Sequence, residues 1–249
     1  MIIKKREKEV DIEIIILTFN KIEITKKCLD LLYQNTSIPF GLILIDNGSN
    51  DGTQDYLKDF SETKDNITLI FNSVNFGIIK GRNQGYNMSQ FLINIPDKIV
   101  FLDNDQFVQK EWLKSHLDKL NSGFDIVGVE AWQMRNDFHP LKKIKKEEEN
   151  FNYIGAGGIL IKNEVIKDIG LFDERYGIMF YEDPDFCWRA FDKGYKIGWN
   201  PEPIIIHQPH LLLGRNREKI LFFRQSWGEH RNKWKGRSLP IMNNNIITK

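Results

Sequence analysis

A pair of carboxylates near the middle of the chain has the spacing of a metal site. Residues 98–102 (KIVFL) end in four apolar residues, the pattern of a strand buried on both faces, and Asp103, Asn104 and Asp105 follow directly. In an extended chain residues i and i+2 point to the same side, so the two carboxylates should face one spot. A cation between them would relieve their repulsion, and oxygen ligands suit Mg²⁺ or Mn²⁺. The alternative is a polar turn, which Asp and Asn also favour.

A second acidic group lies later in the chain, at Glu182, Asp183 and Asp185. The residues from Pro184 onward have a helical pattern, so these carboxylates crowd a helix N-terminus, where anions are favoured. They could cap the helix, or Asp183 could be a general base held at a rigid turn. His207 ends a later apolar run. A lone histidine there is usually structural, so a metal-binding role for it needs other support.

The first half of the chain contains the elements that would position these groups. Four apolar, largely β-branched runs predict buried strands, at residues 12–18, 42–45, 67–71 and 98–102. Helical patterns lie between them, at residues 23–33, 53–60 and 75–92. This alternation indicates a doubly wound, mostly parallel sheet of the α/β class. Ligands of such sheets bind outside the carboxyl ends of the strands, where polar residues follow the apolar runs of this chain.

The second half has a weaker pattern. A helix is expected at residues 111–120, and strands at 125–130, 196–199 and 203–207. The charged stretch 135–150 predicts a solvated, mobile loop, with a lid or an acceptor-facing loop as the alternative. Residues 153–162 are extended and carry glycines that indicate a bulge or a close approach to a ligand. Residues 211–234 mix apolar and basic residues, which favours packing on the domain or on a second copy over contact with a membrane.

Composition sets further bounds. A net charge of +1 over 249 residues gives no field that would attract nucleic acid. No apolar run has the length of a transmembrane helix, and the charged N-terminus does not have the pattern of a signal peptide, so we expect a cytoplasmic protein. Cys28 and Cys187 lie in helical patterns beside apolar residues, which predicts free buried thiols.

Taken together, these motifs resemble glycosyltransferase family 2, whose members have the GT-A fold. The motifs follow one another in order at residues 17–20 (LTFN), 45–53 (IDNGSNDGT), 75–77 (NFG), 81–83 (GRN), 102–105 (LDND), 155–158 (GAGG), 170–173 (GLFD), 181–183 (YED), 188–189 (WR) and 207 (H). An Asp-x-Asp motif is weak evidence by itself, but the ordered set covers most of the chain. The later motifs are most similar to rhamnosyltransferase-type members.

The resemblance implies an inverting transfer of a sugar from a nucleoside diphosphate donor, with UDP and dTDP both open, to a hydroxyl group. The acceptor would be a glycan, a lipid-linked glycan or a protein, and the cofactor Mn²⁺ or Mg²⁺. Thr18 and Asn20 would lie along the nucleoside, and Asp46 would accept a hydrogen bond from the base. Arg82 or Asn83 would approach the donor.

The resemblance also implies roles for the two acidic groups. Asp103 would contact the ribose or the metal, Asp105 would bind the metal directly, and His207 would complete the metal site. Asp183 would be the base that takes the acceptor proton, with Glu182 as its neighbour or alternate. The chain lacks the added helices and pore of polymerising synthases, so we expect an enzyme that makes single transfers.

The implied organisation is a GT-A (Rossmann-like) sheet flanked by helices, with a C-terminal extension on the acceptor side. One domain would span residues 1–235: a nucleotide-binding half (11–105), an acceptor and catalytic half (106–210) and a helical segment (211–235), with 236–249 as a flexible tail. A homodimer, or a peripheral contact at the inner face of a membrane, stays open. Two other interpretations are a non-catalytic nucleotide- or sugar-binding module, which needs no base, and a nucleotidyltransferase. The latter requires a glycine-rich basic loop after the first strand, which this chain lacks.

Overall fold

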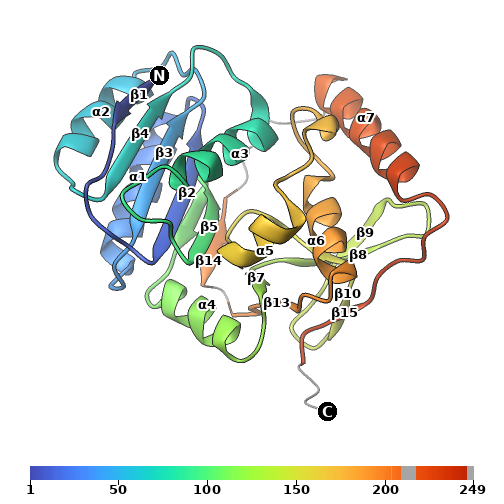
Figure 1. Cartoon of the computed structure of the whole chain (residues 1–249). Helices are drawn as coiled ribbons and strands as arrows, with labels where there is room; N and C mark the ends of the chain where they lie inside the picture. The colour runs from blue at the N-terminus through green and yellow to red at the C-terminus, as the bar shows by residue number, and fades with distance from the viewer. Residues whose placement is uncertain (203, 209–216, 246–249) are drawn as a thin grey trace.

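One eight-stranded sheet lies at the centre of the computed structural model, which describes residues 1–202, 204–208 and 217–245 (Figure 1). Its strands in spatial order are β1 (Ile2–Lys4), β4 (Ile67–Phe71), β3 (Gly41–Asp46), β2 (Ile12–Thr18), β5 (Lys98–Asp103), β12 (Ile159–Lys162), β7 (Ile126–Gly128) and β13 (Ile197–Trp199). Strands β2 to β5 run parallel, and β13 runs parallel to β7. Strand β1 is antiparallel to β4, and β12 is antiparallel to both of its neighbours. The predicted α/β class with a mostly parallel sheet is therefore confirmed.

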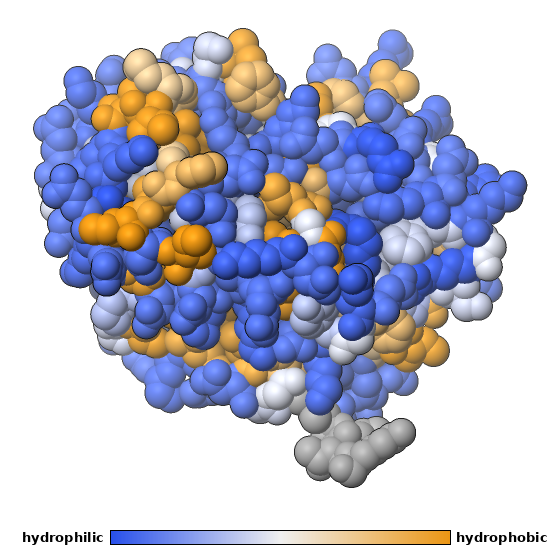
Figure 2. Space-filling model, in the orientation of Figure 1, coloured by the Kyte–Doolittle hydropathy of each residue, from blue (hydrophilic) through white to orange (hydrophobic). Residues whose placement is uncertain are grey.

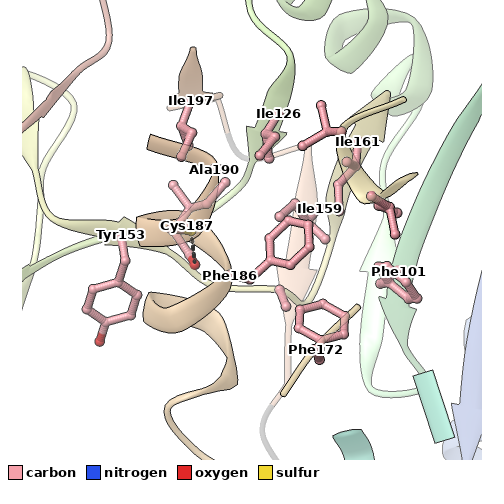
Figure 3. Packing of buried hydrophobic residues seen from close by; sticks show 14 of the residues in the cluster. Phe101, Ile126, Tyr153, Ile159, Ile161, Phe172, Phe186, Cys187, Ala190 and Ile197 are labelled. Carbon is pink, nitrogen blue, oxygen red and sulfur yellow. Dashed lines mark hydrogen bonds between the residues drawn. The ribbon is translucent and has the colours of Figure 1, made fainter. Parts of the chain in front are cut away.

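Helices cover both faces of this sheet. They are α1 (Ile22–Asn35), α2 (Thr53–Glu62), α3 (Gly77–Ser89), α4 (Trp112–Asn121), α5 (Asn163–Ile169), α6 (Glu182–Asp192) and α7 (Arg217–Lys233), with a 3₁₀ turn at Glu174–Tyr176. Alternate residues of β2 point to opposite faces, so Ile14 packs with α1, α2 and α4, whereas Ile15 packs with α3, α5 and α6. In the second of these layers, Ile159 of the central sheet lies beside Phe186 of α6, and Phe172 contacts both Phe186 and Phe101 (Figure 3).

Three smaller sheets lie in the second half of the chain. One contains β11 (Tyr153–Ile154), β8 (Ala131–Met134) and β9 (Pro140–Lys143) in that order. The second pairs β14 (Ile205–His207) with β6 (Gln106–Val108), and the third pairs β10 (Asn150–Phe151) with β15 (Met242–Asn243). The sequence shows no clear pattern for several of these strands because each contains only two to four residues.

The charged stretch 135–150 is not the open loop that the sequence predicts. Strands β8 and β9 pair as an antiparallel hairpin, and Phe138 and Ile144 are 6% and 4% exposed. The lysines that flank Ile144 are exposed, so the sequence of this stretch does not indicate that Ile144 is buried. Residues 153–162 also differ from the single extended segment expected, because the glycines at 155–158 divide them between two sheets.

The C-terminal part of the chain is more ordered than predicted. Helix α7 lies within the expected helical segment, of which residues 211–216 fall outside the described part. Within the expected flexible tail, Met242 is 3% exposed and pairs with Phe151, and the backbone N–H of Asn244 donates to the Glu149 carbonyl. Residues 246–249 are not described. The C-terminal strand therefore pairs with β10 and packs on the second half of the chain.

The face seen in Figure 2 is mostly hydrophilic, with apolar side chains gathered over the half that contains α1, α2 and α3. Exposed apolar residues include Phe91 and Ile93, which follow α3. Both cysteines, Cys28 and Cys187, are free and buried, as predicted. Among the described helices, none combines the length and the hydropathy needed to cross a bilayer.

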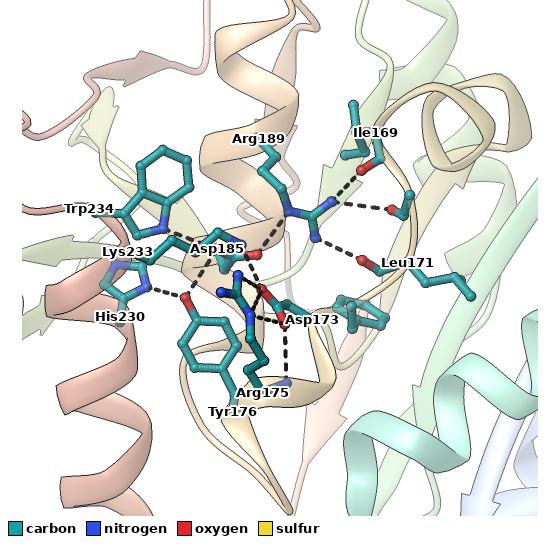
Figure 4. Close-up of polar contacts among 12 residues, drawn as sticks. Ile169, Leu171, Asp173, Arg175, Tyr176, Asp185, Arg189, His230, Lys233 and Trp234 are labelled. Carbon is teal, nitrogen blue, oxygen red and sulfur yellow. Dashed lines mark hydrogen bonds and ion pairs between the residues drawn. The ribbon is translucent and has the colours of Figure 1, made fainter.

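A buried polar network joins α7 to α6 (Figure 4). The Asp185 carboxylate, which is fully buried, accepts hydrogen bonds from the Tyr176 hydroxyl (3.0 Å) and the Trp234 indole N–H (3.0 Å). It also forms ion pairs with Arg189 (2.8 Å) and Lys233 (2.6 Å). Because Tyr176 lies in the 3₁₀ turn, Arg189 on α6 itself, and Lys233 and Trp234 at the end of α7, this carboxylate fixes the C-terminal helix against the helix that begins at Glu182.

A buried histidine of this network predicts acid sensitivity. His230 is 0% exposed, and burial lowers its pKa to about 3, well below the value near 6.5 of an unfolded histidine. As the pH falls below 6.5, the unfolded chain binds a proton that the folded chain does not, so stability falls by about 1.4 kcal/mol per pH unit. Between pH 6.5 and 5, wild type should therefore lose about 2 kcal/mol more unfolding free energy than His230→Phe, measured by urea denaturation. Equal pH slopes in the two proteins would contradict this.

Candidate active site

The carboxyl ends of the central strands bring the predicted donor residues together. In the sheet register Thr18 lies opposite Asp46, and Leu17 lies opposite Asp103. The ends of β2, β3 and β5 thus meet at one edge, where ligands of open α/β sheets bind. The residues that follow these strands build the candidate site.

Asp46 organises the loop that follows β3. Its carboxylate is 0% exposed and accepts hydrogen bonds from the backbone N–H groups of Gly48 (3.1 Å) and Ser49 (2.9 Å). The side chains of Gln54 (2.7 Å), Thr18 (3.2 Å) and Ser49 also donate to it. A hydrogen bond from a base to this carboxylate stays a prediction, and in the structure both of its oxygens accept from protein donors. Its observed role is to shape the loop.

Asn20 ties the turn after β2 to the same loop. Its side-chain oxygen accepts from the backbone N–H of Asn50 (2.9 Å), and its own N–H donates to the Ser49 hydroxyl (2.6 Å). Asn20 and Lys21 both have left-handed backbones, with φ of 54° and 65°. Asn tolerates this conformation better than most residues, which explains the choice of Asn at this turn.

Arg82 brings the two acidic groups together. Its guanidinium is buried, and Nη2 lies 2.8 Å from Oδ1 of Asp103. Nη1 lies 3.4 Å from Oε1 of Glu182 and 3.9 Å from Oδ1 of Asp183. One cation therefore compensates three carboxylates from distant parts of the chain. The predicted approach of Arg82 to the donor stays a prediction, and the contacts that the structure shows are with acidic side chains.

Asn83, the next residue of α3, is used within the protein. Its amide nitrogen donates to the Phe172 carbonyl (2.9 Å) and to Oε1 of Glu174 (3.1 Å), and its oxygen accepts from the Phe172 N–H (3.2 Å). The side chain fixes the segment that precedes α6 and is not brought to the metal-site carboxylates. Its partners lie about 90 residues away in sequence, so no local signal indicates this role.

Asp105 and His207 are neighbours, as predicted for a metal site. Strands β6 and β14 pair with Gln106 opposite His207, which places Nε2 of His207 3.4 Å from Oδ1 of Asp105. The hydrogen bond with Asp105 raises the pKa of His207. Within residues 1–202, 204–208 and 217–245 no group of three metal-ligating side chains is formed. A carboxylate and an imidazole are nevertheless ligands that Mn²⁺ accepts, and Mg²⁺ and related ions commonly complete their shells with water and phosphate oxygens. The donor set therefore fits a divalent ion.

Asp183 and Glu182 follow a strained turn. Phe180 and Tyr181 have φ of 75° and 65°, a conformation that L-residues rarely adopt in succession. Oδ1 of Asp183 and Oε2 of Glu182 are buried without a hydrogen-bond partner among the described residues, whereas the Ala156 N–H donates to the Asp183 carboxylate. Burial, and then the neighbouring Glu182 charge, raise the pKa of Asp183 well above its usual value. A carboxylate with these properties is suited to accepting a proton.

Sequence reasoning missed two residues that support Asp103. The side-chain oxygen of Gln106 accepts from the Asp103 N–H (2.9 Å), and this side chain is 2% exposed. A Cβ atom at Gly157 would lie 2.5 Å from Oδ2 of Asp103, so any other residue there would displace this carboxylate. The glycine-rich stretch 155–158 signalled a close approach, but not which group it approaches.

Comparison with known proteins places this geometry in a family. The model of the family described as glycosyl transferase family 2 matches residues 13–188. The glycosyltransferase AglE of Haloferax volcanii is 26% identical over 208 residues, an alignment that covers 79% of this chain and 66% of AglE. This chain therefore spans slightly less than two thirds of that relative.

Two solved structures share the fold. The mannosyltransferase PcManGT of Pyrobaculum calidifontis, solved with GDP-Man and Mn²⁺, has a TM-score of 0.63 at 16% identity, over 81% of this chain and 58% of that chain. S. aureus TarS 1–349, solved with UDP-GlcNAc, has a TM-score of 0.60 at 16% identity, over 83% of this chain and 62% of that chain. At these identities the similarity is one of fold, and it confirms the predicted GT-A architecture.

The ion pairs of Arg82 predict that the protein loses stability when this side chain is removed. Arg82→Met leaves Glu182 and its neighbours buried without their cation, so we expect the free energy of unfolding to fall by about 3 kcal/mol at pH 8. The loss should be smaller at pH 5, because protonated carboxyl groups need no cation, and Arg82→Met/Glu182→Gln should recover part of it. Lys114→Met, which removes an exposed pair with Asp118, should change stability by no more than about 0.5 kcal/mol. Urea unfolding of the four proteins measures this, and a loss at Arg82 as small as that at Lys114 would refute it.

Proposed function

The chain belongs to glycosyltransferase family 2 and is a glycosyltransferase, and from this premise we propose that it transfers a sugar from UDP or dTDP to an acceptor hydroxyl with inversion. The observation that carries the proposal is the convergence of Asp103, Glu182 and Asp183 on Arg82. Inversion needs one in-line displacement, and therefore one base on the acceptor side. Because the chain spans only part of its relatives, the donor, the acceptor and the partners are all part of the proposal.

Asp183 is the proposed base. The Ala156 N–H fixes its carboxylate, and the strained turn before α6 fixes its backbone. Its raised pKa makes it a stronger proton acceptor than an ordinary aspartate when it is ionised. Glu182 and Asp183 both approach Nη1 of Arg82, and the charge of Glu182 would help to keep the pKa of Asp183 raised.

Asp105 and His207 would hold the metal, Mn²⁺ or Mg²⁺, with Asp103 contacting the metal or the ribose. Such an ion would neutralise charge on the departing diphosphate when it is bound. The 3.4 Å approach of Asp105 to His207 supports this role. Gln106 and Gly157 keep the first carboxylate of the motif in register with the second.

The nucleoside would lie over the turns held by Asn20 and Asp46. The Thr18 hydroxyl donates a hydrogen bond to Asp46 beneath this region. The nucleoside base would contact the loop whose shape Asp46 fixes. Arg82 and Asn83 would act as positioning residues for the acidic groups and for the segment before α6. We propose a glycan, a lipid-linked glycan or a protein as the acceptor.

The base assignment predicts a kinetic result. Asp183→Asn should lower kcat by about 10²–10⁴-fold, which corresponds to roughly 3–5 kcal/mol of barrier, with UDP binding unchanged. Asp192→Asn, at the exposed far end of α6, is the matched control and should keep wild-type kcat. The measurement is UDP or dTDP release from a panel of nucleotide sugars, with UDP affinity from calorimetry. A parallel loss of UDP affinity in Asp183→Asn would show that the residue is structural.

The metal assignment predicts a thermal result. With UDP or dTDP at 100 times its dissociation constant, Mn²⁺ should raise the stability of wild type by about 2.7 kcal/mol, or roughly 5–10 °C in Tm. Asp105→Ala and His207→Ala should lose most of this shift, whereas the surface variant Asp118→Ala should retain it. EDTA should abolish the shift in wild type. A shift that survives EDTA or both substitutions would overturn the assignment.

A further inference from the structure

Two aromatic rings lie side by side near the proposed base. Trp132 on β8 and Tyr153 on β11 are cross-strand neighbours, with ring centroids 6.5 Å apart and planes inclined by 13°. Cross-strand neighbours project from the same face of a sheet. Trp132 is partly exposed, whereas Tyr153 is buried. The two rings are therefore stacked, and the partly exposed indole offers a flat apolar surface.

The strand that carries Tyr153 leads directly to Asp183. The indole N–H of Trp188 donates to the Asn152 carbonyl (2.9 Å), and the thiol of Cys187 donates to the Ile154 carbonyl (3.6 Å). Two residues later, the Ala156 N–H donates to Asp183 itself. Every second residue from 152 to 156 is thus fixed to α6, and the tyrosine projects between the first two contacts. Its ring points away from the neighbouring residues of α6 (Figure 3).

The Tyr153 hydroxyl is available to a ligand. Other buried tyrosines use their hydroxyls within the protein, as Tyr176 does with Asp185 and Tyr181 with the Phe138 carbonyl. In the described part of the chain, Tyr153 has no such partner. Burial, followed by the charge of Asp183, raises the pKa of Tyr153, so the phenol stays protonated and can donate.

A charged pair borders the open side of this surface. Lys143 of β9 lies opposite Trp132 on the other side of the hairpin and forms an ion pair of 2.6 Å with Glu130. A flat apolar face, a free phenol and a charged rim together match a sugar ring, which presents a C–H face and a belt of hydroxyl groups. An alkyl chain has no polar group that could bond to the Tyr153 hydroxyl or to the Lys143–Glu130 pair.

We propose that Trp132 and Tyr153 form the subsite for a pyranose ring of the acceptor. The indole packs on the C–H face of the ring, and the Tyr153 hydroxyl donates to a sugar oxygen beside Asp183. This inference rests on the proposed function, because it assigns a saccharide to the acceptor side of that base. Trp132 and Tyr153 then select the acceptor and take no part in donor binding.

The direct test is binding of simple sugars. Saturation-transfer NMR would use methyl pyranosides of glucose, galactose, mannose, N-acetylglucosamine and rhamnose, with UDP and Mn²⁺ present. Wild type should saturate the ring protons of at least one glycoside, and Trp132→Ala should reduce that signal at least fivefold. Trp132→Phe should keep more than half of it, and Tyr153→Phe should reduce it at least twofold. Phe91→Ala, which removes an aromatic ring that is 75% exposed, should leave it unchanged.

A second measurement separates this inference from the proposed function. Release of UDP or dTDP from nucleotide sugars in water requires the donor site and the base but no bound acceptor sugar, so it tests the proposed reaction independently of the subsite. No saturation of any glycoside by wild type, or saturation by Trp132→Ala or Tyr153→Phe that equals that of wild type, would overturn the subsite. Trp132-dependent binding in a wild type that releases no nucleotide would instead support the subsite and count against the proposed reaction.

Discussion

The site depends on one buried cation. Asp103 and Glu182 would repel each other if they approached without compensation, and the Arg82 guanidinium between them makes their approach favourable. Close packing of α3 on the sheet delivers that guanidinium. A Cβ at Gly81 would lie 2.5 Å from the Leu17 side chain, so glycine lets the helix lie directly on β2. The first half of the chain thereby supplies the charge that holds α6, in the second half, beside β5.

At the end of β3, neutral hydrogen-bond donors take the place of a cation in compensating a buried carboxylate. Asp46 is fully buried, yet backbone amides, hydroxyls and one amide side chain surround it. A buried carboxylate that accepts several hydrogen bonds is stable and fixes every group that donates to it. The loop after β3 thus has its shape before any nucleotide arrives, which lowers the entropy that binding must overcome.

The elements that could be predicted from sequence are those with a long local pattern. The runs that became β2 and β5 are β-branched and bounded by polar residues, and Pro184 with its acidic neighbours marked α6 correctly. The approach of His207 to Asp105 was expected only from the family resemblance, because the two strands that bring them together contain three residues each. The contacts of Asn83 have no signal in the sequence, because its partners are far away along the chain. The hairpin that contains the lysines of 142–146 has no periodic pattern, because only a few buried apolar residues stabilise it.

Strand β12 is the one member of the sheet interior that opposes its neighbours. At the edge of the sheet where β5 ends, a strand parallel to β5 can contribute only the residues that follow its own last residue. An antiparallel strand offers the residues before its beginning, so the chain enters β12 from the active edge, where Gly158 donates to the Phe101 carbonyl. Because β12 runs in the opposite direction, the segment before it also reaches the edge where β5 ends. Loops in the second half of the chain can therefore change in length without altering the parallel strands that would frame the nucleotide.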